Sequence, residues 1–451
     1  MKNILFTFSL VTTSFVFSQG KKAERLQIAN QIENSIQHEM LNKWYPQNND
    51  TLYGGFITTF TYDFKPTGDQ DKFIVTQARH TWSTSKAAMR YPGVTYFKTL
   101  AQNGYRFLHD VMWDKTYGGF YTMVGRKGNV IDSTKNAYGN AFGIYALAAY
   151  CKLSNDHNAL SFAQEAFMWL EKHSHDPLHK GYYQHMQRDG TPIQRTPNTP
   201  ATVETGYKDQ NSSIHLLEAF TELYAVWPND LLRERLHEML FLIRDVMIGN
   251  KGYLTLFFQP DWTPVSIRDS AETYIIAHHG LDYVSFGHNV ETSYLLLEAS
   301  HTLNLQHDTT TTLRIAKQMV DHALQHAWDN ETGGFYDAGY YFKSKPGLTI
   351  ISKEKNWWSQ AEAMNSLLLM SDLFPNDPMH YYNKFRQQWK YIQTYMIDHT
   401  YGDWYANGID IDPKIKTSLK GHIWKGNYHQ FRSMMNCVDR LRGGQMHSAV
   451  R

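Results

Sequence analysis

Six turns that combine glycine with an aromatic residue recur along this chain at intervals of 63 to 81 residues. They are Tyr53-Gly54-Gly55-Phe56, Tyr117-Gly118-Gly119-Phe120, Lys180-Gly181-Tyr182-Tyr183, Lys251-Gly252-Tyr253, Gly333-Gly334-Phe335-Tyr336 and Tyr401-Gly402-Asp403-Trp404. A repeat of this length holds two helices and their connections, and each hairpin can bury its apolar face only against its neighbours. We therefore expect an all-α fold, an (α/α)6 barrel of six helical hairpins with short β elements in its loops. A functional site is expected at the concave end of the ring.

The spacing of apolar residues predicts where the helices lie. The first spans residues 21–45, where apolar residues recur at intervals of three, four and seven. Others are predicted over residues 137–152, 159–173, 212–226, 231–248, 290–303, 311–328, 358–373 and 380–396. Long loops are expected over 189–210 and 344–355, and residues 55–62 are expected to pair with 118–123 as short strands.

The N-terminus resembles a secretory signal peptide over residues 1–18. A short positive start, Met1-Lys2-Asn3, precedes a mostly apolar run over 4–17, and cleavage is expected before Gln19. No cysteine follows that would carry a lipid anchor, and no other segment is long and apolar enough to span a membrane. We expect residues 19–451 to form one catalytic barrel domain, exported without a membrane anchor to a bacterial periplasm.

Composition narrows the class of partner. The formal net charge of the 451-residue chain is +1, which gives no electrostatic case for nucleic acid. Aromatic residues make up 14% of the chain, including 12 Trp and 29 Tyr, and flat rings of this kind cover the C–H faces of sugars. With only Cys151 and Cys437, disulfide-dependent folding is not expected. A small oligosaccharide is the expected partner, and the oligomeric state is left open.

Five segments place polar, ionisable residues at the start of an otherwise apolar helix. They cover residues 77–82, 211–219, 287–293, 357–363 and 424–432. A single histidine at a helix start is most often a cap, but His215, His288 and His429 fall at corresponding places in different hairpins, and a ring brings such places together. Three histidines and a glutamate could also hold zinc. Their spacing is not a dedicated ligand pattern and Arg79 would oppose a cation, so no metal is expected.

These segments resemble the N-acylglucosamine 2-epimerase superfamily, and most closely its cellobiose 2-epimerase branch. The matching motifs are Gln-Ala-Arg-x-x-Trp (77–82), Asn-x-x-x-His-x-x-Glu-Ala (211–219), Gly-His-x-x-Glu (287–291), Trp-Trp-x-Gln-Ala-Glu (357–362) and a closing Trp…Tyr-His-x-x-Arg (424–432). The resemblance covers about residues 25–440. It implies an (α/α)6 barrel, no organic cofactor and a sugar that isomerises at C2.

The resemblance also implies roles for individual residues. His288 and His429 would be the acid/base pair, and His215 would assist ring opening or polarise the carbonyl. Glu291 would orient His288 and raise its pKa. The remaining candidates would bind the sugar, either at the oxygens near C1 and C2 or by stacking on its rings: Arg79, Tyr138, Asn211, Trp357, Trp358, Glu362 and Trp424.

Inversion at C2 explains why two imidazoles are expected. A proton next to a carbonyl must leave one face of an opened sugar and return on the other, which a single base does not easily reach. Histidine suits both tasks because its pKa lies near the working pH. We expect an epimerase acting through a cis-enediolate on a β-1,4-linked disaccharide of the cellobiose, mannobiose or lactose type, and the export signal favours mannan utilisation.

Three alternatives stay open from the sequence. An aldose–ketose isomerase of the mannose isomerase type would use the same enediolate but return the proton at C1. An (α/α)6 glycoside hydrolase would need two carboxylates across the scissile bond, for which Glu291 and Glu362 are the candidates. A non-catalytic sugar-binding protein would exchange no C2 proton. Which histidine takes the proton first is also open.

Overall fold

The computed structural model describes residues 20, 22–305 and 308–444. The predicted signal peptide, residues 1–18, lies outside the described residues. Within the described residues no helix combines the length and the apolar character that a membrane span requires. Cys151 and Cys437 are both buried, and each is a free thiol, as expected.

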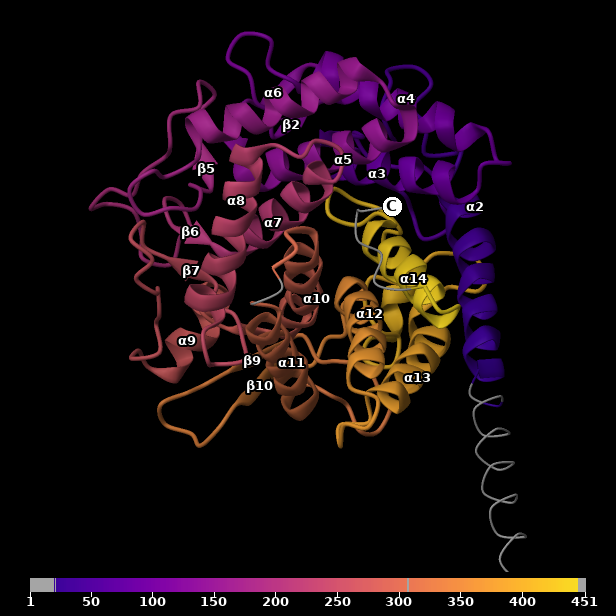
Figure 1. The fold of residues 1–451 in the computed structure, drawn as a ribbon, viewed down its shortest axis with the longest axis vertical. Helices are drawn as coiled ribbons and strands as arrows, with labels where there is room; N and C mark the ends of the chain where they lie inside the picture. Colours follow the sequence, from indigo (N-terminus) through magenta and orange to yellow (C-terminus); the bar gives the residue numbers. More distant parts are fainter. Residues whose placement is uncertain (1–19, 21, 306–307, 445–451) are drawn as a thin grey trace, which may run out of the picture.

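An inner ring of helices closes on itself around the centre of the molecule (Figure 1). Each inner helix packs against the next in chain order, and the last packs against the first. They are α3 (Ile74–Arg90), α5 (Ala137–Ser154), α7 (Gln210–Tyr224), α10 (Phe286–Thr302), α12 (Trp357–Leu373) and α14 (Tyr428–Leu441). Because neighbours cover them on every side, these helices are buried over most of their length.

A second set of helices surrounds the first, one outer helix against each inner one. The outer set comprises a helix over 22–34 that continues into η1 (Ser35–Leu41) and α2 (Asn42–Trp44), α4 (Tyr96–Phe107) with η2 (Leu108–Met112), α6 (His157–His173), α8 (Asp230–Phe241) with η3 (Leu242–Ile248), α11 (Thr309–His326) and α13 (Tyr381–Tyr391) with η5 (Ile392–Met396). Each buries one face and exposes the other. The (α/α)6 barrel expected from the repeats is confirmed.

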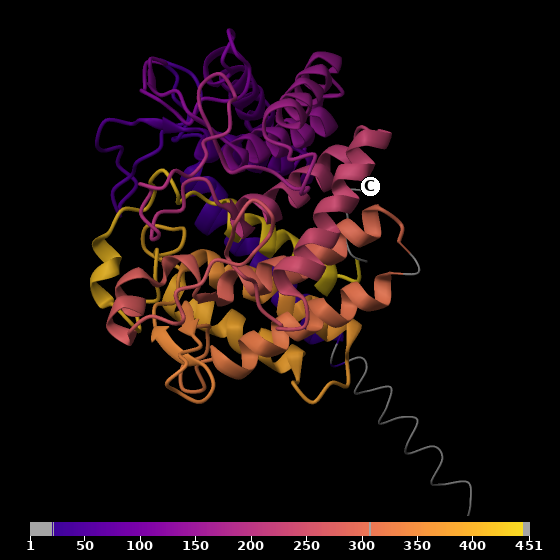
Figure 2. The same ribbon diagram turned by 90° about the vertical axis from the view of Figure 1, so that its left-hand side faces the viewer.

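Short antiparallel strands lie just before the inner helices, at the end of the barrel where the loops gather (Figure 2). They form a sheet of β1 (Lys72–Phe73), β2 (Met123–Val124) and β3 (Val130–Asp132), pairs of β4 (Lys135–Asn136) with β5 (His185–Met186) and of β6 (Lys208–Asp209) with β7 (Phe257–Phe258), and a sheet of β8 (Val284–Ser285), β9 (Ala338–Tyr340) and β10 (Thr349–Ser352). Strand β10 falls inside the loop predicted over 344–355, so that prediction is wrong in part.

The predicted pairing of residues 55–62 with 118–123 is also wrong. Five of the six glycine–aromatic turns instead bridge back to the segment that ends their own outer helix, as Phe56 does to Asn49 and Phe120 does to Trp113. Two short helices, α9 (Glu272–His278) and η4 (His279–Leu281), lie within the longest interval between turns, and a third, η6 (Pro413–Thr417), precedes α14.

A buried aspartate–lysine pair fastens five of the six turns. In the first, one oxygen of Asp50 accepts the backbone N–H groups of Leu52 and Tyr53, and the other accepts Lys72 Nζ at 2.9 Å. The same arrangement recurs at Asp114–Lys135, Asp176–Lys208, Asp329–Lys355 and Asp398–Lys420. The remaining repeat has the apolar Ile248 and Val284 at these positions. Because this repeat lacks both the aspartate and the lysine, no charge is buried there without its partner.

The first helical turns are fastened to these turns by side-chain amides. Gln77 Oε1 accepts the Phe56 N–H at 2.8 Å, and Gln77 Nε2 donates to the Phe56 carbonyl. Gly55 has φ +65°, and a Cβ there would stand 2.6 Å from Gln77 Oε1, so only glycine admits this approach. Gln360 grips Phe335 in the same way. The two motif glutamines therefore set the height of α3 and α12 in the barrel.

Candidate active site

One cavity of about 240 Å³ collects nearly all the candidate residues at the N-terminal ends of the inner helices. It is lined by Arg79, Tyr138, Asn211, His215, His288, Glu291, Trp357, Trp358, Trp424 and His429. Of the candidates, Glu362 alone does not line the cavity, and it contacts His429 from beneath. The cavity brings His215, His288 and His429 together, but only two of them stand at corresponding places. His288 and His429 each lie four residues after Val284 or Lys425, whereas His215 lies seven residues after Lys208.

A common register explains why these residues meet. The floor of the site comes from the position seven residues after each buried lysine or its counterpart Val284: Arg79, Phe142, His215, Glu291, Glu362 and Arg432. Here the lysine of the last repeat is Lys425, which pairs with Asp403 at 2.8 Å. Because the turns fix all six helices at one height, these side chains form a single layer. Arg432 was noted only as the end of a motif, and its role was missed.

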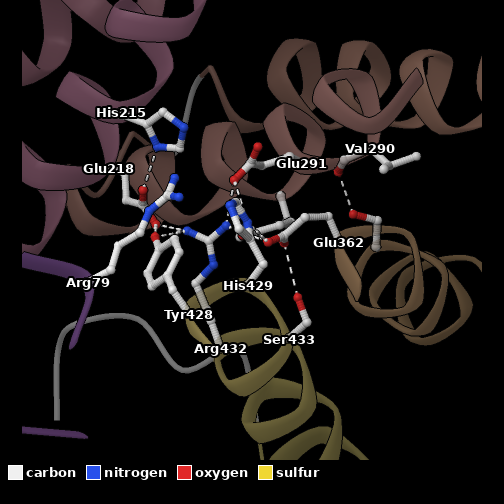
Figure 3. Close-up of polar contacts among 12 residues, drawn as sticks. Arg79, His215, Glu218, Val290, Glu291, Glu362, Tyr428, His429, Arg432 and Ser433 are labelled. Atoms are coloured by element: carbon white, nitrogen blue, oxygen red, sulfur yellow. Dashed lines mark hydrogen bonds and ion pairs between the residues drawn. The ribbon is translucent and has the colours of Figure 1, made fainter. Parts of the chain in front are cut away.

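His429 is held by a carboxylate from the neighbouring helix α12. Its Nδ1–H donates to Glu362 Oε1 at 2.7 Å (Figure 3). The other Glu362 oxygen accepts from Tyr294 at 2.9 Å and from Ser433 at 3.1 Å, which leaves that carboxylate little freedom. This tautomer turns an unprotonated Nε2 toward the cavity. Burial and the Arg79 guanidinium hold the pKa of His429 well below its usual range, so the ring is a neutral base.

His288 is held differently. Its Nδ1 lies 2.8 Å from the hydroxyl of Ser285, the residue that precedes α10. Burial lowers the pKa of His288 to about 4. The expected pairing with Glu291 is wrong: Glu291 Oε1 accepts from Arg432 at 2.6 Å and lies 3.8 Å from His429 Nδ1. His288 and Glu291 share a helix face, but the Glu291 carboxylate binds Arg432 of α14 instead of His288.

His215 is paired with a carboxylate on its own helix. Its Nδ1 donates to Glu218 Oε2 at 2.9 Å, across one turn of α7. Its ring packs edge-on against Tyr138, with centroids 5.1 Å apart. Burial and the Arg79 and Arg432 guanidinium groups lower the pKa of His215 well below its usual range. The cavity therefore presents three neutral imidazoles.

Arg79 is fixed in place as a donor. It donates to the Tyr138 hydroxyl at 2.9 Å and to the Trp424 carbonyl at 3.3 Å, and its guanidinium lies over the Phe142 ring at 4.4 Å. Polar atoms around it have no hydrogen-bond partner among the described residues, namely Arg79 Nε, Asn211 Oδ1 and Glu291 Oε2. Buried polar atoms of this kind suit a ligand rich in hydroxyl groups.

Tryptophan rings form the apolar part of the wall. Trp358 packs close to both imidazoles, with its centroid 4.7 Å from that of His288 and 5.8 Å from that of His429. Trp424 is 46% exposed although it lines the cavity, which places it at the mouth. Trp357 completes this side.

Among the described residues, one cluster of side chains could supply ligands to a metal ion, and a guanidinium already lies within it. Ligand atoms of Glu291, Glu362 and His429 lie within 4.8 Å of one another. However, Arg432 already donates to Glu291 Oε1 at 2.6 Å and to Glu362 Oε1 at 2.8 Å. The guanidinium occupies the position that a cation would take.

Comparison with known proteins decides the family. Residues 55–433 match the family model described as N-acylglucosamine 2-epimerase (GlcNAc 2-epimerase). The chain belongs to this family. The match begins in the first glycine–aromatic turn and ends one residue after Arg432, so it includes every residue that lines the cavity.

Relatives in the N-acylglucosamine 2-epimerase family are sugar epimerases and isomerases. A cellobiose 2-epimerase from Bacteroides fragilis is 26% identical over 91% of this chain and 98% of its own length. A D-mannose isomerase from Marinomonas mediterranea is 24% identical over 86% of this chain and 91% of its own. The solved cellobiose 2-epimerase of Spirochaeta thermophila aligns with a TM-score of 0.79 and 27% identity, covering 93% of this chain and 98% of that one. The resemblance seen in the five motifs is confirmed, and the protein is an enzyme of this class.

Proposed function

We propose that the enzyme inverts C2 of the reducing-end aldose of a β-1,4-linked disaccharide through a cis-enediolate. The observation that carries this proposal is a single cavity lined by His288 and His429, each with its Nδ1 tied to a partner. With Nδ1 engaged, each ring has only Nε2 left for the substrate. Two such nitrogens are what a proton transfer from one face of C2 to the other requires.

The histidine partners favour His429 as the first base. A carboxylate behind Nδ1 stabilises the imidazolium that forms when Nε2 takes the C2 proton. Ser285 carries no charge, so His288 returns its proton more readily once it holds one. In this direction the C2–H bond breaks, Nε2–H forms on His429, and the electron pair moves into the C1–C2 bond and onto the carbonyl oxygen. His288, which enters the reaction with a proton on Nε2, then donates this proton to the opposite face of C2.

The enediolate oxygens need fixed donors. Arg79 is held by Tyr138 and the Trp424 carbonyl, and Asn211 stands on the next inner helix but one. Donors fixed before the reaction stabilise the developing charge without reorganising. His215, paired with Glu218, is in position to assist opening of the sugar ring. The second sugar ring would stack on Trp424 at the mouth.

An aldose–ketose isomerase remains the second candidate, since it uses the same enediolate and a D-mannose isomerase is among the relatives. Hydrolysis fits the site less well. Carboxyl groups that flank a glycosidic bond stand roughly 5–10 Å apart with the bond between them. Here Arg432 bridges Glu291 and Glu362, and Glu362 lies beneath His429 instead of in the cavity.

The signal-like N-terminus supports export, so we also propose a periplasmic location and a role in mannan utilisation. The activity is tested by incubating the protein with cellobiose, mannobiose, lactose or mannose in D₂O and following the sugars by NMR. Deuterium at C2 of a disaccharide and appearance of its C2 epimer are expected. Deuterium at C1 with a ketose product would point to the isomerase, and no exchange in any sugar would leave a binding protein.

A further inference from the structure

Arg432 lies at the centre of a buried network beneath the cavity (Figure 3). Its guanidinium donates to Glu291 and Glu362, and it also contacts Glu218 and Tyr428. Its side chain is 5% exposed. The three carboxylates come from three different inner helices, α7, α10 and α12, so one charge joins half of the ring.

Two of these carboxylates hold histidines of the cavity. Glu218 is bonded to His215 and Glu362 to His429. We infer that Arg432 is a positioning residue that links the two His–Glu pairs, so that its charge controls the protonation of His429. This inference rests on the proposed function, in which the two pairs belong to an epimerase.

Charge and burial support this link. Three buried carboxyl groups, those of Glu218, Glu291 and Glu362, face two guanidinium groups, those of Arg79 and Arg432. Burial lowers the pKa of Arg432 only to about 9, so it stays charged at neutral pH. Burial raises the pKa of Glu291 to about 8 and that of Glu362 well above its usual range, so burial favours protons in this cluster, and the charge of Arg432 opposes them.

Other ionisable groups also face the network. The phenols of Tyr138, Tyr145, Tyr294 and Tyr428 have raised pKa values because they are buried, so they stay neutral. On the side away from the sugar, Arg432 and Glu218 also line a cavity of about 430 Å³. The other ionisable groups that line this second cavity are Lys86, Arg90, Lys152, Glu222, Glu298 and Asp439, and burial raises the pKa of Glu298 to about 7.

Inversion needs a neutral His429, because a proton already bound at Nε2 would occupy the nitrogen that takes the C2 proton. A charge that keeps protons off His429 therefore keeps the base available.

The test follows the titration of the His429 ring by ¹⁵N NMR in the free protein, together with the pH profile of kcat/KM. Arg432→Met removes the positive charge that the three carboxyl groups share and is expected to raise the pKa of His429 by about 1–3 pH units, moving the acid limb upward. Arg432→Lys keeps the charge and is expected to leave the limb in place, but to lower kcat because one ammonium cannot bridge three carboxylates.

A double variant guards against simple misfolding. Replacing Glu218 with Gln together with Arg432→Met restores the original charge difference, so the His429 titration is expected to return toward that of the wild type. Arg440→Met removes an equally buried arginine of α14 about 12 Å farther along the helix, and it is expected to leave the titration unchanged.

An unchanged His429 titration in Arg432→Met, an equal shift in Arg440→Met, or a double variant that stays at the shifted value would overturn the inference. The titration needs no substrate, so its outcome is separate from that of the proposed function. If the wild type exchanges no C2 proton but the titrations behave as stated, the network stands and the proposed activity fails.

Discussion

Glu362→Gln is the substitution that most sharply separates base catalysis by His429 from a merely structural role. In the wild type the His429 Nδ1–H donates to Glu362 Oε1 at 2.7 Å, and the same oxygen accepts from Arg432 at 2.8 Å. A glutamine amide keeps the volume but removes the charge. Its NH₂ group can donate to Nδ1, which places the ring proton on Nε2. That nitrogen can then no longer accept the C2 proton.

The expected loss follows from what the contact supplies. A positioned general base contributes roughly 10²–10⁴-fold, and most of that depends on an unprotonated Nε2. We therefore expect kcat for epimerisation to fall about 10²–10⁴-fold, with KM changed less than about threefold because Glu362 does not line the cavity. The assay is the initial rate of deuterium incorporation at C2, with KM from the same progress curves.

Glu298→Gln provides the matched control. Glu298 is a carboxyl on inner helix α10 that lines the cavity on the other side of the barrel, and burial raises its pKa to about 7. Since this group neither lines the candidate active-site cavity nor bonds a histidine of that site, the amide should leave kcat within about threefold of wild type. If Glu362→Gln also keeps wild-type kcat, the assignment of His429 as a carboxylate-supported base is refuted.

Three further predictions concern the pH profile, the sugar-binding wall and the turns. The pKa of His429 lies well below its usual range, and its neutral form is lost only as pH falls through that pKa. The acid limb of kcat/KM in the wild type should therefore lie below the ordinary histidine pKa of about 6.5. An acid limb near pH 7 would contradict this. Trp424→Ala should raise KM for a disaccharide with little change in kcat, and it should affect a monosaccharide less, as steady-state kinetics on both would show. Lys208→Met should leave Asp176 buried without its 2.8 Å partner and lower the free energy of unfolding by about 3–5 kcal/mol, as measured by urea titration. The double variant Asp176→Ile with Lys208→Val copies the repeat that has Ile248 and Val284, so its free energy of unfolding should fall by less.

The barrel was predictable because each repeat carries short, local sequence signals. Each glycine–aromatic turn is a short sequence signal, and the apolar spacing between turns identifies two helices per repeat. The aspartate–lysine pairs behind the turns were not found, because partners stand 21 to 32 residues apart across loops of unequal length. Aligning the repeats on the lysine would have revealed both the pairs and the layer of residues seven positions later.

The candidate site was predictable in membership but not in its contacts. Motifs at the starts of inner helices identified the residues that line the cavity, since a ring must bring those positions together. Helical spacing correctly places Glu291 and His288 on one face, yet it says nothing about side chains arriving from another helix. Arg432 of α14 donates to Glu291, and Glu362 of α12 accepts from His429. Such contacts depend on the closure of the ring.

The most direct test is a crystal structure with the reduced, open-chain alditol of an accepted disaccharide. This ligand resembles the opened sugar but has no carbonyl, so it does not turn over. We expect the Nε2 atoms of His288 and His429 on opposite faces of C2, each within about 3–3.5 Å of that carbon. Both rings on one face of C2, or either nitrogen well beyond that distance, would contradict proton transfer between the two histidines.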